Sequence, residues 1–139
     1  MEQLSNILSE DIHDIFREAS SDLELTIFNL QQKALTSPGL RAKWYGILFA
    51  EKKKLNEMEE KKEKYLEDKV SEQLKLGSRS PKVAIIQQLE KHDPSIIQTD
   101  KIIKAQQDRI DFITPIVRIF DDLNYSIRAS IDLLKLENQ

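Results

Sequence analysis

The sequence predicts an all-α fold, with a long, projecting, hairpin-like helical arm and a C-terminal helical region through which copies of the chain oligomerise. Apolar residues recur every three or four positions along almost the whole chain, and no useful length of sequence alternates with the period of a strand. Only three of the 139 residues are glycine, which β-hairpins and phosphate-binding loops need. A chain of this length forms one domain, here residues 1–139, or a small core with a long arm.

The first helix is expected within residues 1–37. Ser9 is a candidate N-cap, and Glu10 and Asp11 follow in the first turn, where the helix dipole favours acidic side chains. The sequence Thr-Ser-Pro-Gly at residues 36–39 is expected to end this helix, because proline cannot continue it and glycine tolerates a left-handed backbone. The apolar positions of the helix are Ile12, Ile15, Phe16, Ala19, Leu23, Ile27, Leu30 and Ala34.

The second helix is expected over residues 40–76, within a lysine-rich arm and break that extend to residue 91. At 1.5 Å per residue this helix is about 55 Å long, whereas a compact globule of this chain length has a radius of gyration of about 14 Å. Its heptad positions start apolar, at Leu48 and Leu55, and turn polar at Lys62 and Lys69. A strong two-stranded coiled coil is therefore not expected along its whole length, and the helix must project or lie along other subunits.

Two further breaks divide the rest of the chain. The sequence Gly-Ser-Arg-Ser-Pro at residues 77–81 precedes a short helix to about residue 91, and His-Asp-Pro at residues 92–94 interrupts it. The last helical segment, residues 95–137, contains Pro115, which is expected to kink or split it. Its widely distributed apolar residues suit the core of an oligomer. The residues expected to pack there are Ile110, Ile113, Val117, Phe120, Ile127 and Ile131.

The composition excludes several classes of site. Without cysteine there is no disulfide, thiolate nucleophile or Cys-ligated zinc, and His13 and His92 lie far apart in the sequence. Asp108 and Asp111 share a helix face but lack the further ligands of a metal loop. No phosphate-loop, dinucleotide or hydrolase motif is present. We therefore expect no catalytic residues, no metal and no cofactor, and a protein that is not an enzyme. No apolar run approaches the twenty or so residues of a membrane span, and no signal peptide is visible, so a soluble intracellular protein is expected.

Charge points to the middle of the chain. The net charge is −3, but residues 1–39 carry −5 and residues 40–76 carry +2. Single-stranded nucleic acid is bound by cations, which contact phosphates, and by aromatic rings, which stack on bases. The lysine-rich helix supplies both. The candidate DNA-binding residues are Lys61, Lys62, Lys64, Tyr65, Lys69 and Arg79. The alternative is a solvated helix stabilised by ion pairs, in a structural or adaptor protein that binds only proteins.

The order of these features resembles a known family. A Lys-Trp pair at residues 43–44 precedes a Lys/Glu-rich helix, a Gly-Ser-Arg break follows at residues 77–79, and Asp-Pro-Ser-Ile-Ile at residues 93–97 opens a long helix. That helix contains Leu-Asn-Tyr-Ser-Ile-Arg-Ala-Ser-Ile-Asp at residues 123–132. Over about residues 20–137 the chain resembles the UvsY-like recombination mediators of T-even-type tailed bacteriophages.

The resemblance implies a protein that binds single-stranded DNA, helps to remove the phage single-strand-binding protein and promotes loading of the phage recombinase. It also implies ring-like homo-oligomers, heptamers in this family, in the cytoplasm of the infected bacterial host. The family's DNA-binding motif, Lys-Ala-Arg-Leu, is not matched. Lys-Glu-Lys-Tyr at residues 62–65 keeps the basic-x-basic spacing, whereas an ungapped count from Trp44 favours residues 67–70.

Overall fold

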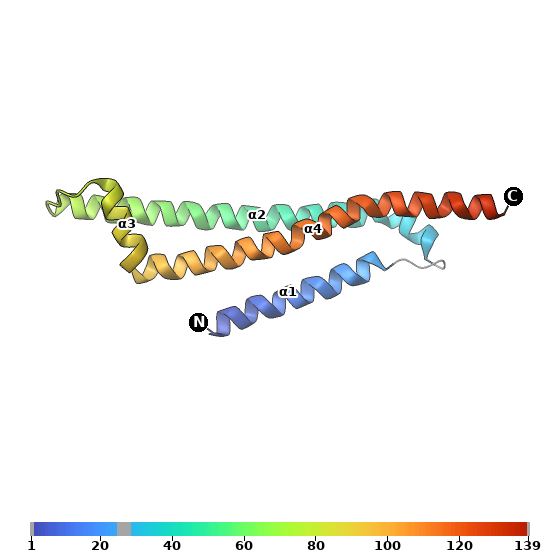
Figure 1. Cartoon of the computed structure of the whole chain (residues 1–139), viewed down its shortest axis with the longest axis horizontal. Helices are drawn as coiled ribbons and strands as arrows, with labels where there is room; N and C mark the ends of the chain where they lie inside the picture. Colours follow the sequence, from blue (N-terminus) through green and yellow to red (C-terminus); the bar gives the residue numbers. More distant parts are fainter. Residues whose placement is uncertain (1, 25–28, 139) are drawn as a thin grey trace. The chain divides into compact units, whose positions relative to one another are not determined.

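The computed structural model describes residues 2–24 and 29–138, with side chains for residues 12–24, 29 and 32–138. It contains α1 (Glu2–Leu23), α2 (Leu30–Lys75), α3 (Lys82–His92) and α4 (Pro94–Glu137) (Figure 1). Within these residues there is no strand, which confirms the predicted all-α class. The expected N-cap Ser9 is wrong, because α1 begins at Glu2 and Ser9 lies inside it.

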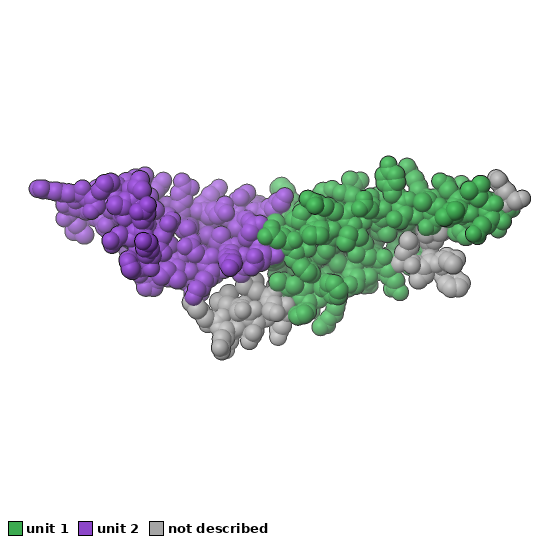
Figure 2. Space-filling view, viewed as in Figure 1, with its two compact units in different colours: residues 1–50, 109–139 green, residues 51–108 purple. Residues whose placement is uncertain are grey.

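The chain divides into two compact units, which Figure 2 distinguishes by colour. Unit 1 comprises residues 1–50 and 109–139, and unit 2 comprises residues 51–108. The long helices α2 and α4 each contribute to both units.

In unit 1, α1 and the first part of α2 pack with the second part of α4. Trp44 is fully buried, and its ring stacks on Phe120 with centroids 5.8 Å apart and an interplanar angle of 14°. Ser37 of α2 is hydrogen-bonded to Asn124 of α4. Because partners on α4 come earlier as those on α2 come later, the two helices are antiparallel here. Offset aromatic stacking at this spacing adds to the free energy gained by burying the two rings.

In unit 2, the remainder of α2 runs antiparallel to the start of α4, with α3 between them in sequence. The side-chain amide of Gln106 donates to the carboxylate of Glu51 at 2.6 Å and to its backbone carbonyl at 2.9 Å, although both residues are buried. The apolar core of this unit consists of Leu55, Val70, Ile85 and Ile96. Of the two heptad positions that turn polar, Lys62 pairs with Asp100 of α4 and Glu90 of α3, whereas Lys69 pairs with Glu72 of its own helix.

The breaks predicted at residues 77–81 and 92–94 are confirmed. Gly77 adopts φ +89°, and the N–H groups of Gly77 and Ser78 donate back to the carbonyls of Leu74 and Gln73. These two bonds form the Schellman arrangement that ends many helices and needs a left-handed residue. At the second break, the Asp93 carboxylate accepts hydrogen bonds from the N–H groups of Ser95 and Ile96 and so caps α4.

The helix end predicted at residues 36–39 is wrong, because α2 begins at Leu30 and contains Pro38. The N-terminal helix α1 ends at Leu23 instead of extending to residue 37. Packing on α4 outweighs the cost of a proline in a helix, about 3 kcal/mol, because Ser37 and Trp44 on either side are buried. Pro115 likewise lies inside α4, which is not split there.

Candidate nucleic-acid interface

The lysine-rich segment forms the unit 2 half of α2 and the turn that follows it. Successive residues of an α-helix point about 100° apart, so neighbouring lysines face different surroundings. The structure separates the predicted DNA-binding residues into one group that faces solvent and another that contacts α3, α4 or its own helix.

Lys61, Lys64 and Arg79 face solvent. All three are exposed, and none has an ion pair or hydrogen bond within the part of the chain that the structure describes. They are available to a polyanion without breaking an existing contact. The sequence predicted that these residues bind DNA, but it could not show that they face solvent whereas Lys62 and Lys69 have partners within the chain.

Lys62 lies against the other helices of unit 2. Its ammonium is 2.7 Å from a carboxylate oxygen of Asp100 on α4 and 3.9 Å from one of Glu90 on α3. Only 23% of its side chain is exposed, compared with 43% for Asp100 and 46% for Glu90. A phosphate would have to replace these carboxylates to bind the same ammonium.

Tyr65 and Lys69 also have partners within the chain. The Tyr65 hydroxyl donates to Asp93 at 3.0 Å, through the carboxylate oxygen that does not receive the helix-capping bond from Ser95. The Lys69 ammonium lies 5.6 Å from the centre of the Tyr65 ring and 3.6 Å from Glu72. This face of the tyrosine is therefore occupied by a cation, as in cation–π pairs.

The turn between α2 and α3 is uniformly basic. No acidic residue occurs from Gln73 to Leu89, and Lys75, Arg79 and Lys82 are exposed there. The Schellman arrangement at Gly77 fixes the direction in which the chain leaves α2. A local positive potential at this turn follows, even though the whole chain has a charge of −3.

The residues predicted to pack between subunits lie mostly inside unit 1. Five of the six are buried by their own chain, so in this structure they are core residues and not available to another subunit: Ile110, Ile113, Val117, Phe120 and Ile127. Ile131 is only half-buried. Helical periodicity indicates that a face packs but not against what, and here that face of α4 packs within its own chain, with Phe120 stacked on Trp44 of α2. The exposed apolar residues of α4 are Ile97, Ile119, Tyr125, Leu133, Leu134 and Leu136.

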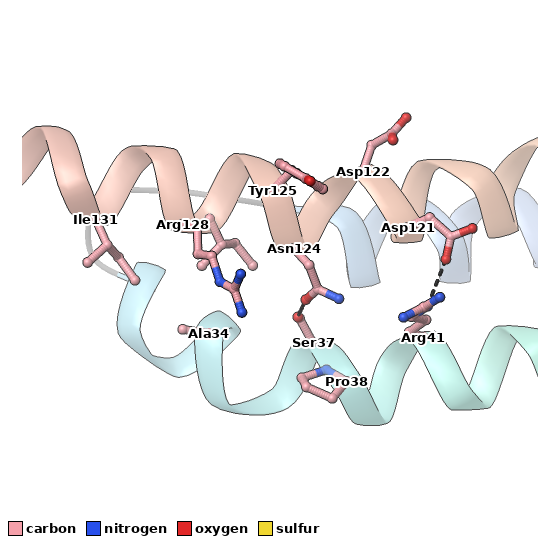
Figure 3. A pocket seen from close by; sticks show the side chains of 11 residues that line it. Ala34, Ser37, Pro38, Arg41, Asp121, Asp122, Asn124, Tyr125, Arg128 and Ile131 are labelled. Carbon is pink, nitrogen blue, oxygen red and sulfur yellow. Dashed lines mark hydrogen bonds and ion pairs between the residues drawn. The ribbon is translucent and has the colours of Figure 1, made fainter.

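A pocket of about 580 Å³ lies between α2 and α4 in unit 1 (Figure 3). The Arg41 guanidinium pairs with Asp121 at 2.7 Å on one side, and Arg128 extends from α4 toward α2 on the other. Asp121 also accepts a hydrogen bond from Tyr45 at 2.9 Å. Sequence reasoning missed this pocket, since it expected a helix break where α2 forms one wall.

A second group missed by sequence reasoning surrounds Asp22 at the end of α1. Its carboxylate accepts from the Trp44 indole N–H at 3.0 Å and from the Lys43 ammonium at 2.7 Å, and Lys43 also pairs with Glu18. Burial raises the pKa of Asp22, but the hydrogen bonds from Lys43 and Trp44 outweigh it and leave that pKa below its usual value. The hydrogen bond to Asp22 and, to a smaller extent, the one to Glu18 raise the pKa of Lys43. These contacts attach α1 to α2.

Among the described residues, no group of three or more histidine or acidic side chains is placed to hold a metal ion. None of the described helices has the length and apolar character needed to cross a membrane.

Comparison with known proteins identifies the fold. No family model matches the sequence, and no curated protein matches it. The crystal structure of the recombination mediator protein UvsY of bacteriophage T4 superimposes with a TM-score of 0.74 and 18% sequence identity. The match covers 91% of this chain and 98% of that one. The resemblance noted in the sequence is thus confirmed at the level of the fold.

Proposed function

From a fold shared with a recombination mediator, we propose that this protein is itself a recombination mediator that binds single-stranded DNA without sequence preference. In this role it promotes loading of a phage recombinase onto DNA covered by single-strand-binding protein, in the cytoplasm of an infected bacterial host. The observation that carries the proposal is a set of exposed cations on unit 2 that have no ion pair or hydrogen bond among the described residues, Lys61, Lys64 and Arg79, within that fold.

Binding is electrostatic in this proposal. Each lysine that contacts a phosphate releases condensed counterions, so the affinity falls as salt is added. The acidic residues between the lysines weaken the field, and binding to one protomer is moderate. Several protomers on one strand raise the overall affinity through effective concentration. No catalytic step is required, and the protein acts as a binding partner and not as an enzyme.

Oligomerisation is the second part of the proposal. The exposed apolar residues near the end of α4, including Leu133 and Leu136, offer a surface that another copy can cover. A ring of copies, a heptamer by resemblance to the family, would present many lysine-rich helices to one DNA strand.

One observation favours an adaptor that binds only proteins as the second candidate. Leu74, Leu76 and Val83 around the basic turn are 50%, 87% and 66% exposed. Aliphatic side chains do not stack on bases as aromatic rings do, so these residues suit a protein partner better than DNA.

The test is a salt series of binding to a labelled single-stranded oligonucleotide. Lys61→Ala with Lys64→Ala is expected to weaken binding about 25-fold at 0.1 M salt for a bound protomer, because each phosphate contact contributes about fivefold under those conditions. The control is Lys91→Ala with Lys104→Ala, which removes the same charge from two other exposed lysines of unit 2. Equal losses in both variants, or none in either, would contradict the assignment.

A further inference from the structure

Lys62 is the basic residue of the predicted DNA-binding set that two other helices of unit 2 engage. Asp100 on α4 and Glu90 on α3 approach its ammonium to 2.7 and 3.9 Å. Tyr65, one turn further along α2, donates its hydroxyl to Asp93 at the junction of α3 and α4. We call Glu90, Asp93 and Asp100 the acidic corner.

The acidic corner presents anionic oxygen atoms to α2, as the phosphates of a nucleic-acid strand would. A carboxylate, like a phosphate, is an anionic oxygen acceptor for a lysine ammonium. The Lys62 ammonium already contacts two carboxylates. A phosphate that binds it must therefore compete with Glu90 and Asp100. By contrast, Lys61 and Lys64 on the solvent side have no carboxylate contact among the described residues.

The pairing is open enough to be displaced. Asp100 and Glu90 are 43% and 46% exposed, so water and salt screen their attraction for Lys62. Asp93 differs, because one of its oxygens caps α4 while the other receives Tyr65. Neutralising Glu90 and Asp100 therefore changes the availability of Lys62 and leaves the helix cap intact.

We propose that Glu90 and Asp100 set the DNA affinity of this protein by withholding Lys62 from the phosphate backbone. The inference rests on the proposed binding of single-stranded DNA and adds which lysines contribute in the native chain. Lys61, Lys64 and Arg79 contact phosphates directly, and Lys62 does so only when its two carboxylate partners are displaced or neutralised. The acidic corner thereby keeps binding moderate and reversible, which suits a protein that transfers a strand to another protein.

The experiment measures the affinity for a labelled single-stranded oligonucleotide from 0.05 to 0.3 M salt. Glu90→Gln with Asp100→Asn is expected to raise the affinity about fivefold at 0.1 M salt for each protomer in contact with the strand. The slope of log affinity against log salt should steepen by about 0.7, the value of one more phosphate contact on single strands. In the unaltered chain, Lys62→Ala should change the affinity less than twofold.

Two controls separate a released lysine from a general change in charge. Glu67→Gln with Asp68→Asn removes the same negative charge from two exposed residues of α2 that have no partner among the described residues. This variant should leave the slope unchanged. Adding Lys62→Ala to the Glu90→Gln, Asp100→Asn variant should restore the original slope. Far-UV circular dichroism checks that each variant keeps its helix content. If the Glu90→Gln, Asp100→Asn variant does not, Asp100→Asn alone takes its place.

The outcomes are distinguishable. If the unaltered chain binds DNA but the corner variant shows no steeper slope, or if its gain survives Lys62→Ala, the role of the acidic corner is wrong and the proposed function stands. If the unaltered chain shows no salt-dependent binding to single strands, the proposed function itself fails.

Discussion

At the scale of single residues, the contacts of Asp22 with Trp44 and Lys43 attach α1 to α2. Trp44 is fully buried between the Phe120 ring and the end of α1, and its indole N–H is satisfied by Asp22. The Lys33 ammonium donates to the backbone carbonyl of Asp22 at 2.6 Å, which satisfies one of the last carbonyls of α1. None of these pairings follows from periodicity alone, because their partners lie on different helices.

The shifted pKa of Asp22 predicts an acid-sensitive contact. Folding lowers this pKa below its ordinary value of 3.8, so the unfolded chain binds the proton more readily. The stabilisation is therefore complete well above pH 3.8 and is lost as the pH falls through the folded pKa. Asp22→Asn should lower the free energy of unfolding at pH 7, and the difference from the unaltered chain should shrink as the pH falls below 3.8. A difference that stays constant from pH 7 to pH 3 would contradict the charged role.

At the scale of helices, the sequence predicted those elements whose ends have local signals. Gly77 follows the end of α2, and Asp93 and Pro94 lie where α3 ends and α4 begins. Each of these signals depends only on residues close to it in the sequence. At the start of α2, the carbonyl of Asn29 accepts a hydrogen bond from the N–H of Lys33. The sequence prediction instead started this helix after the Pro-Gly pair at residues 38–39. That signal failed because packing against α4 is a long-range effect.

Gly77 gives a test at this scale. Its φ of +89° is unfavourable for a residue with a β-carbon, so Gly77→Ala should lower the free energy of unfolding by about 1–2 kcal/mol. Gly46→Ala is the matched control, because Gly46 is helical and a β-carbon there meets nothing within 4 Å. That variant should stabilise the chain by about 0.4–1 kcal/mol. Urea unfolding followed by circular dichroism measures both, and a stabilised Gly77→Ala variant would exclude the left-handed turn.

The candidate site was predictable in composition but not in orientation. The sequence located the lysines and Tyr65 on one helix, and the structure describes all of them there. Which of them face solvent depends on where α3 and α4 pack, and that depends on side chains 28–38 positions away, such as Asp93 and Asp100. The same dependence explains why residues such as Ile113 and Phe120, which were expected to pack between subunits, lie in the core of their own chain.

At the scale of the whole molecule, acidic and basic charge have separate locations. Residues 1–39 carry a charge of −5, and the segment from Gln73 to Leu89 carries only basic charges. Exposed leucines lie near the end of α4, at positions 133, 134 and 136. In the proposed function, the exposed cations Lys61, Lys64 and Arg79 of unit 2 contact DNA and the end of α4 contacts other copies. The two activities therefore use different residues and are separable by substitution.

The most direct test of the central claim is the solution mass by light scattering, with and without single-stranded DNA at low salt. A mediator of this kind should have a mass several times the 16.2 kDa of one chain, rising further when an oligonucleotide is added and returning when the salt is raised. A 16.2 kDa monomer whose mass is unchanged by DNA would contradict the account.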